Sequence, residues 1–104
     1  MEVKVSREAA RELEEAAAWY EAEEAGLGGQ LVDAFEYATQ LLKEPNPPLA
    51  PIIGKAAGFG AKRLALYRFP FSLVTVQRGH TLLVVVAFAH HSRAPGYWRK
   101  RTTP

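Results

Sequence analysis

The spacing of apolar residues divides the chain into a helical part and a strand part. Apolar residues recur every three or four positions in two stretches, at Ala9, Leu13, Ala16 and Tyr20 and again at Leu31, Phe35, Ala38 and Leu42. This spacing predicts two amphipathic helices. Further along, the period changes to two, which predicts strands over residues 62–69, 71–77 and 81–89. A short alternating stretch over residues 1–6 predicts one more strand before the first helix.

Capping residues, glycines and prolines set the expected ends of these elements. Ser6 is a favourable N-cap for the first helix, and Gly26 is expected to end that helix in a left-handed conformation. The link over residues 26–29 is short enough to make the two helices an antiparallel hairpin. The prolines of residues 45–48 end the second helix, and residues 45–60 are expected to form a long irregular crossing. Arg78 and Gly79 predict a tight turn between the last two strands.

The order of these elements predicts one α+β domain spanning residues 1–104. A chain of 104 residues has room for one core. The strand over residues 81–89 is apolar on both faces, so we expect it in the centre of the sheet and under the helices. The predicted fold is a short N-terminal strand and a helical hairpin packed on a small antiparallel sheet, in the order β-α-α-β-β-β.

Acidic and basic residues are separated along the chain. All eleven acids lie in the first 44 residues together with four basic residues, whereas the rest of the chain has nine Lys or Arg and no acid. The formal charges of the two parts are −7 and +9. This asymmetry favours an anionic partner for the basic part, although acidic helices and basic strands that neutralise each other would also explain it. The basic part cannot supply carboxylates for hydrolysis or for binding Mg²⁺ or Ca²⁺.

Other sequence features limit the compartment and the chemistry. The chain has no cysteine, which excludes disulfides, a thiol nucleophile and thiolate-bound zinc. Its longest apolar run, residues 82–89, is eight residues long, well below the ~20 that a membrane helix needs. The N-terminus has no apolar segment behind a basic start, as a signal peptide would. We therefore expect a cytoplasmic protein without membrane contact.

Two histidines and two groups of glycines are candidates for chemistry. His90 and His91 end the last predicted strand, where successive side chains point to opposite faces, so a shared metal ion is disfavoured. Two interpretations remain open. One histidine could act as a general acid or base or contact a phosphate, or a histidine could be structural and bond to the following loop. The glycines of residues 26–29 and 54–60 lack the strand, helix and GK[ST] context of a phosphate-binding loop. The sequence therefore predicts neither a metal nor a cofactor.

The C-terminal stretch over residues 90–101 interleaves cations with aromatic residues. Arginines bind phosphates bidentately and aromatic rings stack on unpaired bases, which favours nucleic acid or another anionic partner. The alternative is that Tyr97 and Trp98 fold back into the core while the cations solvate a frayed end. Arg63, Arg68 and Arg78 lie on or beside the strands that lead to this stretch.

Two motifs resemble a known family. Residues 63–71 read R-x-x-x-x-R-F-P-F, and residues 90–101 read H-x-x-R-x-P-x-Y-W-x-x-R. Together with the short strand and the acidic helical hairpin, they resemble the RelE/ParE superfamily of toxins from type II toxin–antitoxin modules, which includes plasmid-stabilisation proteins. The resemblance covers nearly the whole chain. It implies a bacterial toxin that arrests growth unless an antitoxin, normally encoded beside it, binds to it.

The two branches of this superfamily imply different targets. RelE-like toxins cleave mRNA on the ribosome without a metal, using sheet cations and a Tyr or His, whereas ParE-like toxins inhibit DNA gyrase. Arg63 falls where RelE-like enzymes carry a sheet cation, and Tyr97 falls where some of them carry a C-terminal tyrosine. Ala65 and Ser72 depart from that pattern, because a second lysine and an arginine would be expected at these positions.

The end of the last strand favours the other branch. His90 and Arg93 match the histidine and arginine that end this strand in ParE-like sequences. The resemblance thus slightly favours ParE-like inhibition of gyrase, with a metal-independent, ribosome-dependent mRNA endonuclease as the alternative. A family member that retains only antitoxin binding is a third interpretation.

The resemblance and the charge pattern together give a set of candidate site residues. As catalytic candidates we take Arg63, His90, Arg93 and Tyr97. As candidates for binding nucleic acid or another target we take Lys62, Arg68, Arg78, Arg99 and Arg101. The expected partners are an antitoxin and either gyrase or ribosome-bound mRNA. We expect the antitoxin to fold across a basic sheet face that displays Arg63 and Tyr67 or their opposite-parity neighbours. Four aromatic residues lie close to it in sequence, namely Phe69, Phe71, Tyr97 and Trp98.

Overall fold

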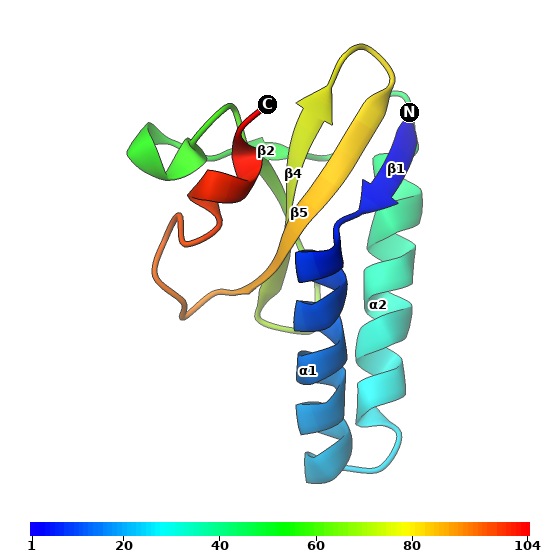
Figure 1. Cartoon of the computed structure of the whole chain (residues 1–104). Helices are drawn as coiled ribbons and strands as arrows, with labels where there is room; N and C mark the ends of the chain where they lie inside the picture. The colour runs from blue at the N-terminus through cyan, green and yellow to red at the C-terminus, as the bar shows by residue number, and fades with distance from the viewer.

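Two helices cover one face of a five-stranded sheet (Figure 1). The computed structural model describes residues 1–104. The strands are β1 (Glu2–Val5), β2 (Ala50–Pro51), β3 (Lys62–Ala65), β4 (Phe71–Arg78) and β5 (Leu82–His90). The helices are α1 (Arg7–Glu23) and α2 (Leu27–Leu42), and two short 3-10 helices are η1 (Gly54–Ala57) and η2 (Arg99–Thr102).

The strand order is β1-β5-β4-β3-β2, with β5 inside the sheet as predicted. β3, β4 and β5 are antiparallel neighbours, so the predicted α+β architecture is confirmed. The sheet is mixed, however, because β1 runs parallel to β5. No hairpin joins β1 to β5, so nothing in the local sequence indicates the direction of this pair. The short strand β2 pairs with β3 inside the segment that was expected to be irregular throughout.

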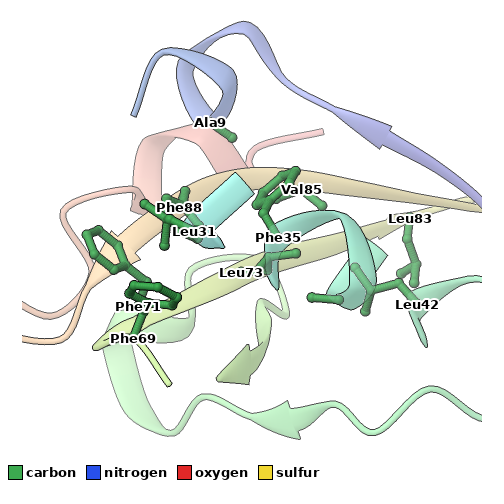
Figure 2. Packing of buried hydrophobic residues seen from close by; sticks show 11 residues of the cluster. Ala9, Leu31, Phe35, Leu42, Phe69, Phe71, Leu73, Leu83, Val85 and Phe88 are labelled. Atoms are coloured by element: carbon green, nitrogen blue, oxygen red, sulfur yellow. The ribbon is translucent and has the colours of Figure 1, made fainter. Parts of the chain in front are cut away.

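The main core lies between the helices and the sheet. Ser6 caps α1 as predicted, since its Oγ accepts a hydrogen bond from the Ala9 backbone N–H at 3.1 Å. Figure 2 shows Leu31 and Phe35 of α2 packed toward the strands. The Phe35 ring meets Phe88 edge-on at 5.4 Å between centroids, and Phe71 stacks on Phe88 at 4.5 Å. The helical spacing in the sequence thus identifies the buried side of the hairpin correctly.

The turn between the helices is tighter than predicted. Gly26 does adopt a left-handed conformation, with φ 89°, but it is the N-cap of α2, whereas α1 already ends at Glu23. The Glu21 carboxylate accepts hydrogen bonds from the backbone N–H groups of Gly26 at 2.9 Å and Gly28 at 3.0 Å. These bonds satisfy donors that a helix N-terminus otherwise leaves free, so α2 begins at once. Gly28 therefore lies within a helix and not in a linker.

Strand β3 is shorter than the strand predicted over residues 62–69. It ends at Ala65, which pairs with Ser72, and a tight turn follows. In this turn the Leu66 N–H donates to the Phe71 carbonyl at 2.9 Å. Tyr67 is fully exposed, whereas Phe69 is buried in the main core. Alternation along one continuous strand therefore does not hold beyond Ala65.

The second face of the sheet is covered by the C-terminal segment and η1, which lie together on the side opposite the helices in Figure 1. A β-bulge between Val74 and Thr75 shifts the pairing so that Val86 and Ala87 both join the apolar cluster on this face. Trp98 is 8% exposed and belongs to the same cluster, which confirms its interpretation as a core residue. Neither α1 nor α2 has the length and apolar character needed to cross a membrane.

Candidate functional site

A pocket of about 330 Å³ lies between the sheet and the C-terminal segment. Arg63 reaches it from β3 and Ser72 from β4, while His90 ends β5 at its edge. The chain then leaves the sheet, and Arg93 and Trp98 line the pocket from the C-terminal segment. The other lining residues are His91 and the apolar Pro51, Ile52, Ile53, Ala56, Val74, Ala89 and Pro95. The pocket thus joins residues from the four strands β2 to β5 and from the C-terminal segment.

The polar lining of this pocket is cationic and rich in hydrogen-bond donors. Arg63 and Arg93 carry permanent charges, and no Asp or Glu is among the lining residues. Neither guanidinium makes a hydrogen bond within the chain, and the Arg93 side chain is 55% exposed. Their donors are therefore free for an incoming anion. Three of the four predicted catalytic residues, Arg63, His90 and Arg93, come together here.

The pocket wall that carries Arg93 is built around one acidic residue of α1, Glu12. The Tyr97 hydroxyl donates to Glu12 Oε2 at 2.6 Å, and Arg101 Nη1 donates to Glu12 Oε1 at 2.9 Å. Glu12 Oε1 also accepts from the Phe88 backbone N–H at 3.1 Å. Arg93 stacks on the Tyr97 ring at 3.8 Å and lies 3.9 Å from Glu12 Oε2. The C-terminal segment is thereby fixed to the first helix.

These contacts change the acidity of Tyr97. Burial, followed by the hydrogen bond to Glu12 and the charge of that carboxylate, raises the pKa of the Tyr97 phenol well above its ordinary value. Arg93 and Arg101 oppose this shift without cancelling it. A phenol that holds its proton this firmly and already donates it to a carboxylate is a poor general base at neutral pH.

The two histidines have different partners. His90 Nδ1 accepts a hydrogen bond from the Ser92 backbone N–H at 3.0 Å, and its ring meets Phe71 edge-on at 4.9 Å. His91 Nε2 is 2.8 Å from the Ser72 hydroxyl. The interpretation of a structural histidine bonded to the following loop is confirmed for His90. Both histidines also line the pocket.

Several of the other predicted binding residues have partners within the chain. Arg78 Nη2 donates to the carbonyls of Thr102 and Thr103 at 3.1 and 2.8 Å, and so fixes the C-terminal end. Arg101 is held by Glu12, and Arg68 donates to Gln30 Oε1 at 2.9 Å. The remaining two, Lys62 and Arg99, have exposed side chains without such bonds.

Arg63 and Tyr67 are exposed as predicted, but the expected open sheet face with further aromatic residues beside it is wrong. Phe69 and Phe71 pack in the main core under the helices, and Trp98 is buried in the second cluster. Tyr97 is partly buried against Glu12. Phe71 shares its side of β4 with Leu73, so the alternation of the strand turns it toward the helices. The C-terminal segment itself covers the face that was expected to be open.

One buried donor in the pocket wall has no partner. Trp98 Nε1 is inaccessible and makes no hydrogen bond, although its side chain lines the pocket. An unpaired buried N–H costs about 1–3 kcal/mol of stability. Such a group in a binding pocket indicates either an internal water or a ligand acceptor.

The arrangement of helices and strands is similar to that of a solved structure. No protein-family model matches the sequence, and no curated protein matches it as a relative. Among solved structures, a chain of the chromosomal ParDE TA system from P. aeruginosa is similar, with a TM-score of 0.70 and 19% sequence identity. The match covers 86% of this chain and 95% of that chain.

The chain has a ParE-like fold. In this ParE-like fold the pocket lies at the C-terminal end of β5, where the predicted motif of residues 90–101 begins. The expectation of the fold from the two motifs is therefore confirmed. The motif itself supplies His90, Arg93 and Trp98 to the lining, while Tyr97 stands behind Arg93.

Glu12 is the site residue that sequence reasoning missed. In the sequence every acid lies in the first 44 residues, so no acid is near the C-terminal cations along the chain. In the ParE-like fold α1 packs on β5, which brings Glu12 to the C-terminal cations across 89 positions of sequence. The only available signal is its place beside Leu13 on the edge of the apolar stripe.

A second groove of the ParE-like fold is largely apolar. It has a volume of about 540 Å³ and lies between α2 and the turn after β3. Tyr37 and Tyr67, which are 68% and 100% exposed, both line it, and Arg68 stands beside them. Exposed aromatic residues around an apolar groove are typical of a protein-binding surface.

Proposed function

We propose that the protein is the toxin of a toxin–antitoxin pair and arrests growth unless its antitoxin is bound. The observation that carries this proposal is the ParE-like fold, which matches a chain of the ParDE TA system over 86% of this chain. The two sequence motifs point in the same direction, and one of them borders the cationic pocket. The protein would act in the cytoplasm, where its targets are found.

ParE-like inhibition of DNA gyrase is the mode of action that we favour. A metal-independent nuclease needs groups that move protons as well as cations. The raised pKa of Tyr97 and its bond to Glu12 disfavour that phenol as a base. Ser72, where a nuclease would carry an arginine, is bonded to His91 instead. These contacts favour a site that binds a target over one that breaks a phosphodiester.

The alternative is RelE-like cleavage of ribosome-bound mRNA. One observation favours it, namely that Arg63 and Arg93 line the same pocket. Preorganised cations stabilise the charge that develops on a cleaving phosphate, and losing one such contact costs about 100-fold or more in rate. In this case Arg63→Ala should reduce mRNA cleavage by about 100-fold.

The antitoxin would bind the apolar groove between α2 and the turn after β3. Because the C-terminal segment covers the second sheet face, this groove is the larger exposed apolar surface. An amphipathic antitoxin segment would bury Tyr37 and Tyr67, and an acidic residue on its rim would meet Arg68. Tyr67→Ala should then weaken the complex while leaving the toxin folded.

Regulated expression with three readouts tests the proposal. Induction of the chain alone should arrest growth, and co-expression of the small reading frame beside its gene should restore growth and yield a copurifying complex. A supercoiling assay with purified gyrase and a map of mRNA 5′ ends then separate the two targets. Loss of supercoiling without new 5′ ends supports the ParE-like mode, whereas new 5′ ends with normal supercoiling support the nuclease.

Variants of the pocket provide the matched controls. Arg93→Ala should relieve growth arrest at equal expression, with an unchanged far-ultraviolet circular dichroism spectrum. Lys100→Ala removes an exposed cation of the same segment outside the pocket and should leave growth arrest unchanged. If the chain does not arrest growth, the proposed function is contradicted. If Arg93→Ala is as toxic as the wild type, Arg93 does not belong to the functional site.

A further inference from the structure

Glu12 lies next to the cationic pocket but is not one of its lining residues. Both ion pairs of the structure are made by Glu12, to Arg101 at 2.9 Å and to Arg93 at 3.9 Å. Glu12 Oε2 accepts a hydrogen bond from the Tyr97 hydroxyl at 2.6 Å, while Arg93 Nη1 lies 3.9 Å from it, beyond hydrogen-bond distance. Arg93 is therefore oriented by Glu12 and the Tyr97 ring without being neutralised by a direct hydrogen bond.

The pocket offers one place for an anion and not a track for a polyanion. Arg68, Arg78 and Arg101 are engaged within the chain, so they do not extend the pocket into a basic groove. On the opposite side of Arg93, Glu12 and Glu15 line the neighbouring hollow. Carboxylates beside the pocket repel a chain of phosphates more strongly than a single charge.

The remaining walls of the pocket are suited to a peptide. Ile52, Pro95 and the 88% exposed Ile53 supply apolar surface next to the two arginines. An acidic side chain flanked by apolar residues would thus match the charge and the apolar walls together.

We propose that this pocket binds one Asp or Glu side chain of an acidic, partly apolar peptide segment between Arg63 and Arg93, and that Glu12 and Tyr97 position Arg93 for it. The carboxylate forms charge-assisted hydrogen bonds with both guanidinium groups. The flanking apolar residue packs on Ile53 and Pro95. This inference rests on the proposed function, because it concerns the pocket in which Arg93→Ala should relieve growth arrest. Its test measures binding and not growth, so the two can fail separately.

Nuclear magnetic resonance of the purified full chain provides a direct test. The chain has two tryptophans, Trp19 and Trp98, so the indole N–H of Trp98 can be followed by itself. The probe is the tripeptide acetyl-Leu-Glu-Leu-amide at millimolar concentration, and its matched control is acetyl-Leu-Gln-Leu-amide. A uridine tetranucleotide is the competing probe. The glutamate peptide should shift the Trp98 signal, and the other two should shift it at least tenfold less at equal concentration.

Substitutions assign the contacts. Arg63→Ala and Arg93→Ala should each weaken binding of the glutamate peptide tenfold or more, the scale of one charge-assisted hydrogen bond. Lys100→Ala is the cation control and should bind like the wild type. Equal shifts by the glutamine peptide, stronger binding of the tetranucleotide, or no shift with any probe would overturn the proposal.

The positioning role of Glu12 and Tyr97 has its own readouts. Tyr97→Phe keeps the ring beneath Arg93 but frees Glu12 Oε2 to pair with that arginine, so peptide affinity should fall about three- to tenfold. Glu12→Gln should lower affinity to a similar extent and also lower the pKa of Tyr97, measured by tyrosinate absorbance against Tyr97→Phe. Glu12→Asp should restore part of the affinity. If both variants fold and bind the peptide like the wild type, Glu12 and Tyr97 do not position Arg93.

Discussion

The two faces of the sheet are buried by different means. The helix-covered face is packed by eleven buried apolar residues, and its aromatic rings contact one another directly. The face under the C-terminal segment has seven buried residues, and the five of them on β4 and β5 are all valine or alanine. That segment contains no regular helix beyond η2, and polar bonds to Glu12 and Arg78 fix its position.

This difference separates stability from function in the fold. Large apolar side chains in close packing contribute stability in proportion to the area that they bury. The face under the C-terminal segment, the tail face, buries fewer large apolar side chains. It also carries the unpaired Trp98 donor and the free arginines of the pocket. Groups arranged for a ligand cost stability when the ligand is absent, so this face should be the less stable of the two.

Truncation of Phe88 should have the largest effect. Phe88 is fully buried between Phe35 and Phe71, and Phe88→Ala removes a ring that the neighbours cannot replace. We expect a loss of about 3–5 kcal/mol in the free energy of unfolding, measured by urea denaturation. Val76→Ala, a control at an equally buried position of the tail face, should cost about 2 kcal/mol. Equal losses at the two positions would contradict the comparison.

Removal of Glu12 should have the next largest effect, although it deletes no apolar packing. Glu12→Ala leaves the Tyr97 hydroxyl and the Phe88 N–H without their acceptor, and Arg101 keeps only the Val86 carbonyl. The Glu12 side chain is only 15% exposed, so water replaces these bonds poorly. We expect a loss of about 2–3 kcal/mol in urea denaturation.

The matched control for Glu12 lies on the same helix. Glu14 is exposed and its side chain makes no hydrogen bond or ion pair, so Glu14→Ala should change stability by less than about 0.5 kcal/mol. A similar result for both glutamates would mean that the C-terminal segment is held without the Glu12 contacts.

The same contrast explains what the sequence could predict. Apolar periods are local, and they correctly placed Leu31 and Phe35 toward the sheet and gave the strands β4 and β5. They also gave the α+β order, because turn residues and prolines mark the element ends. The parallel β1–β5 pair and the two-residue strand β2 depend on contacts between distant segments, which no local period reports.

The candidate site was only partly predictable for the same reason. The motif of residues 90–101 placed Arg93 at the pocket, and the resemblance placed Arg63 there too. The hydrogen bond between Glu12 and Tyr97 joins residues 85 positions apart. The hydrogen bonds of Arg78 likewise join strand β4 to the C-terminal end of the chain. Charge counting treated all these cations alike, whereas the fold engages some of them internally and leaves others free.

A pair of adjacent glycines tests the helix-covered side with a smaller effect. A Cβ on Gly28 would lie 2.5 Å from the Ala17 carbonyl of α1, so Gly28→Ala must push the helices apart. We expect a loss of about 1–2 kcal/mol, read as a lower urea midpoint. Gly29 has no neighbour within 4 Å of an added Cβ, so Gly29→Ala should instead stabilise by about 0.5–1 kcal/mol. If both substitutions raise stability, or both lower it, the close approach of the helices does not limit the size of the residue at position 28.

The smallest effect concerns the tail face and depends on pH. Burial and Glu12 raise the pKa of Tyr97 in the folded protein above its ordinary value of 10.0, which the unfolded chain should show. Above pH 10 the unfolded chain therefore releases the Tyr97 proton while the folded protein keeps it. Because the folded state then binds more protons, stability must fall as pH rises, and the contribution of Tyr97 is complete only below pH 10.

Tyr97→Phe has no phenol to ionise and should lose less stability between pH 9 and pH 11 in parallel urea titrations. Tyr67→Phe, at a fully exposed position, should follow the wild type. If Tyr97→Phe also follows the wild type, the C-terminal segment does not hold Tyr97 against Glu12 in solution, and the contrast between the two faces would rest on apolar packing alone.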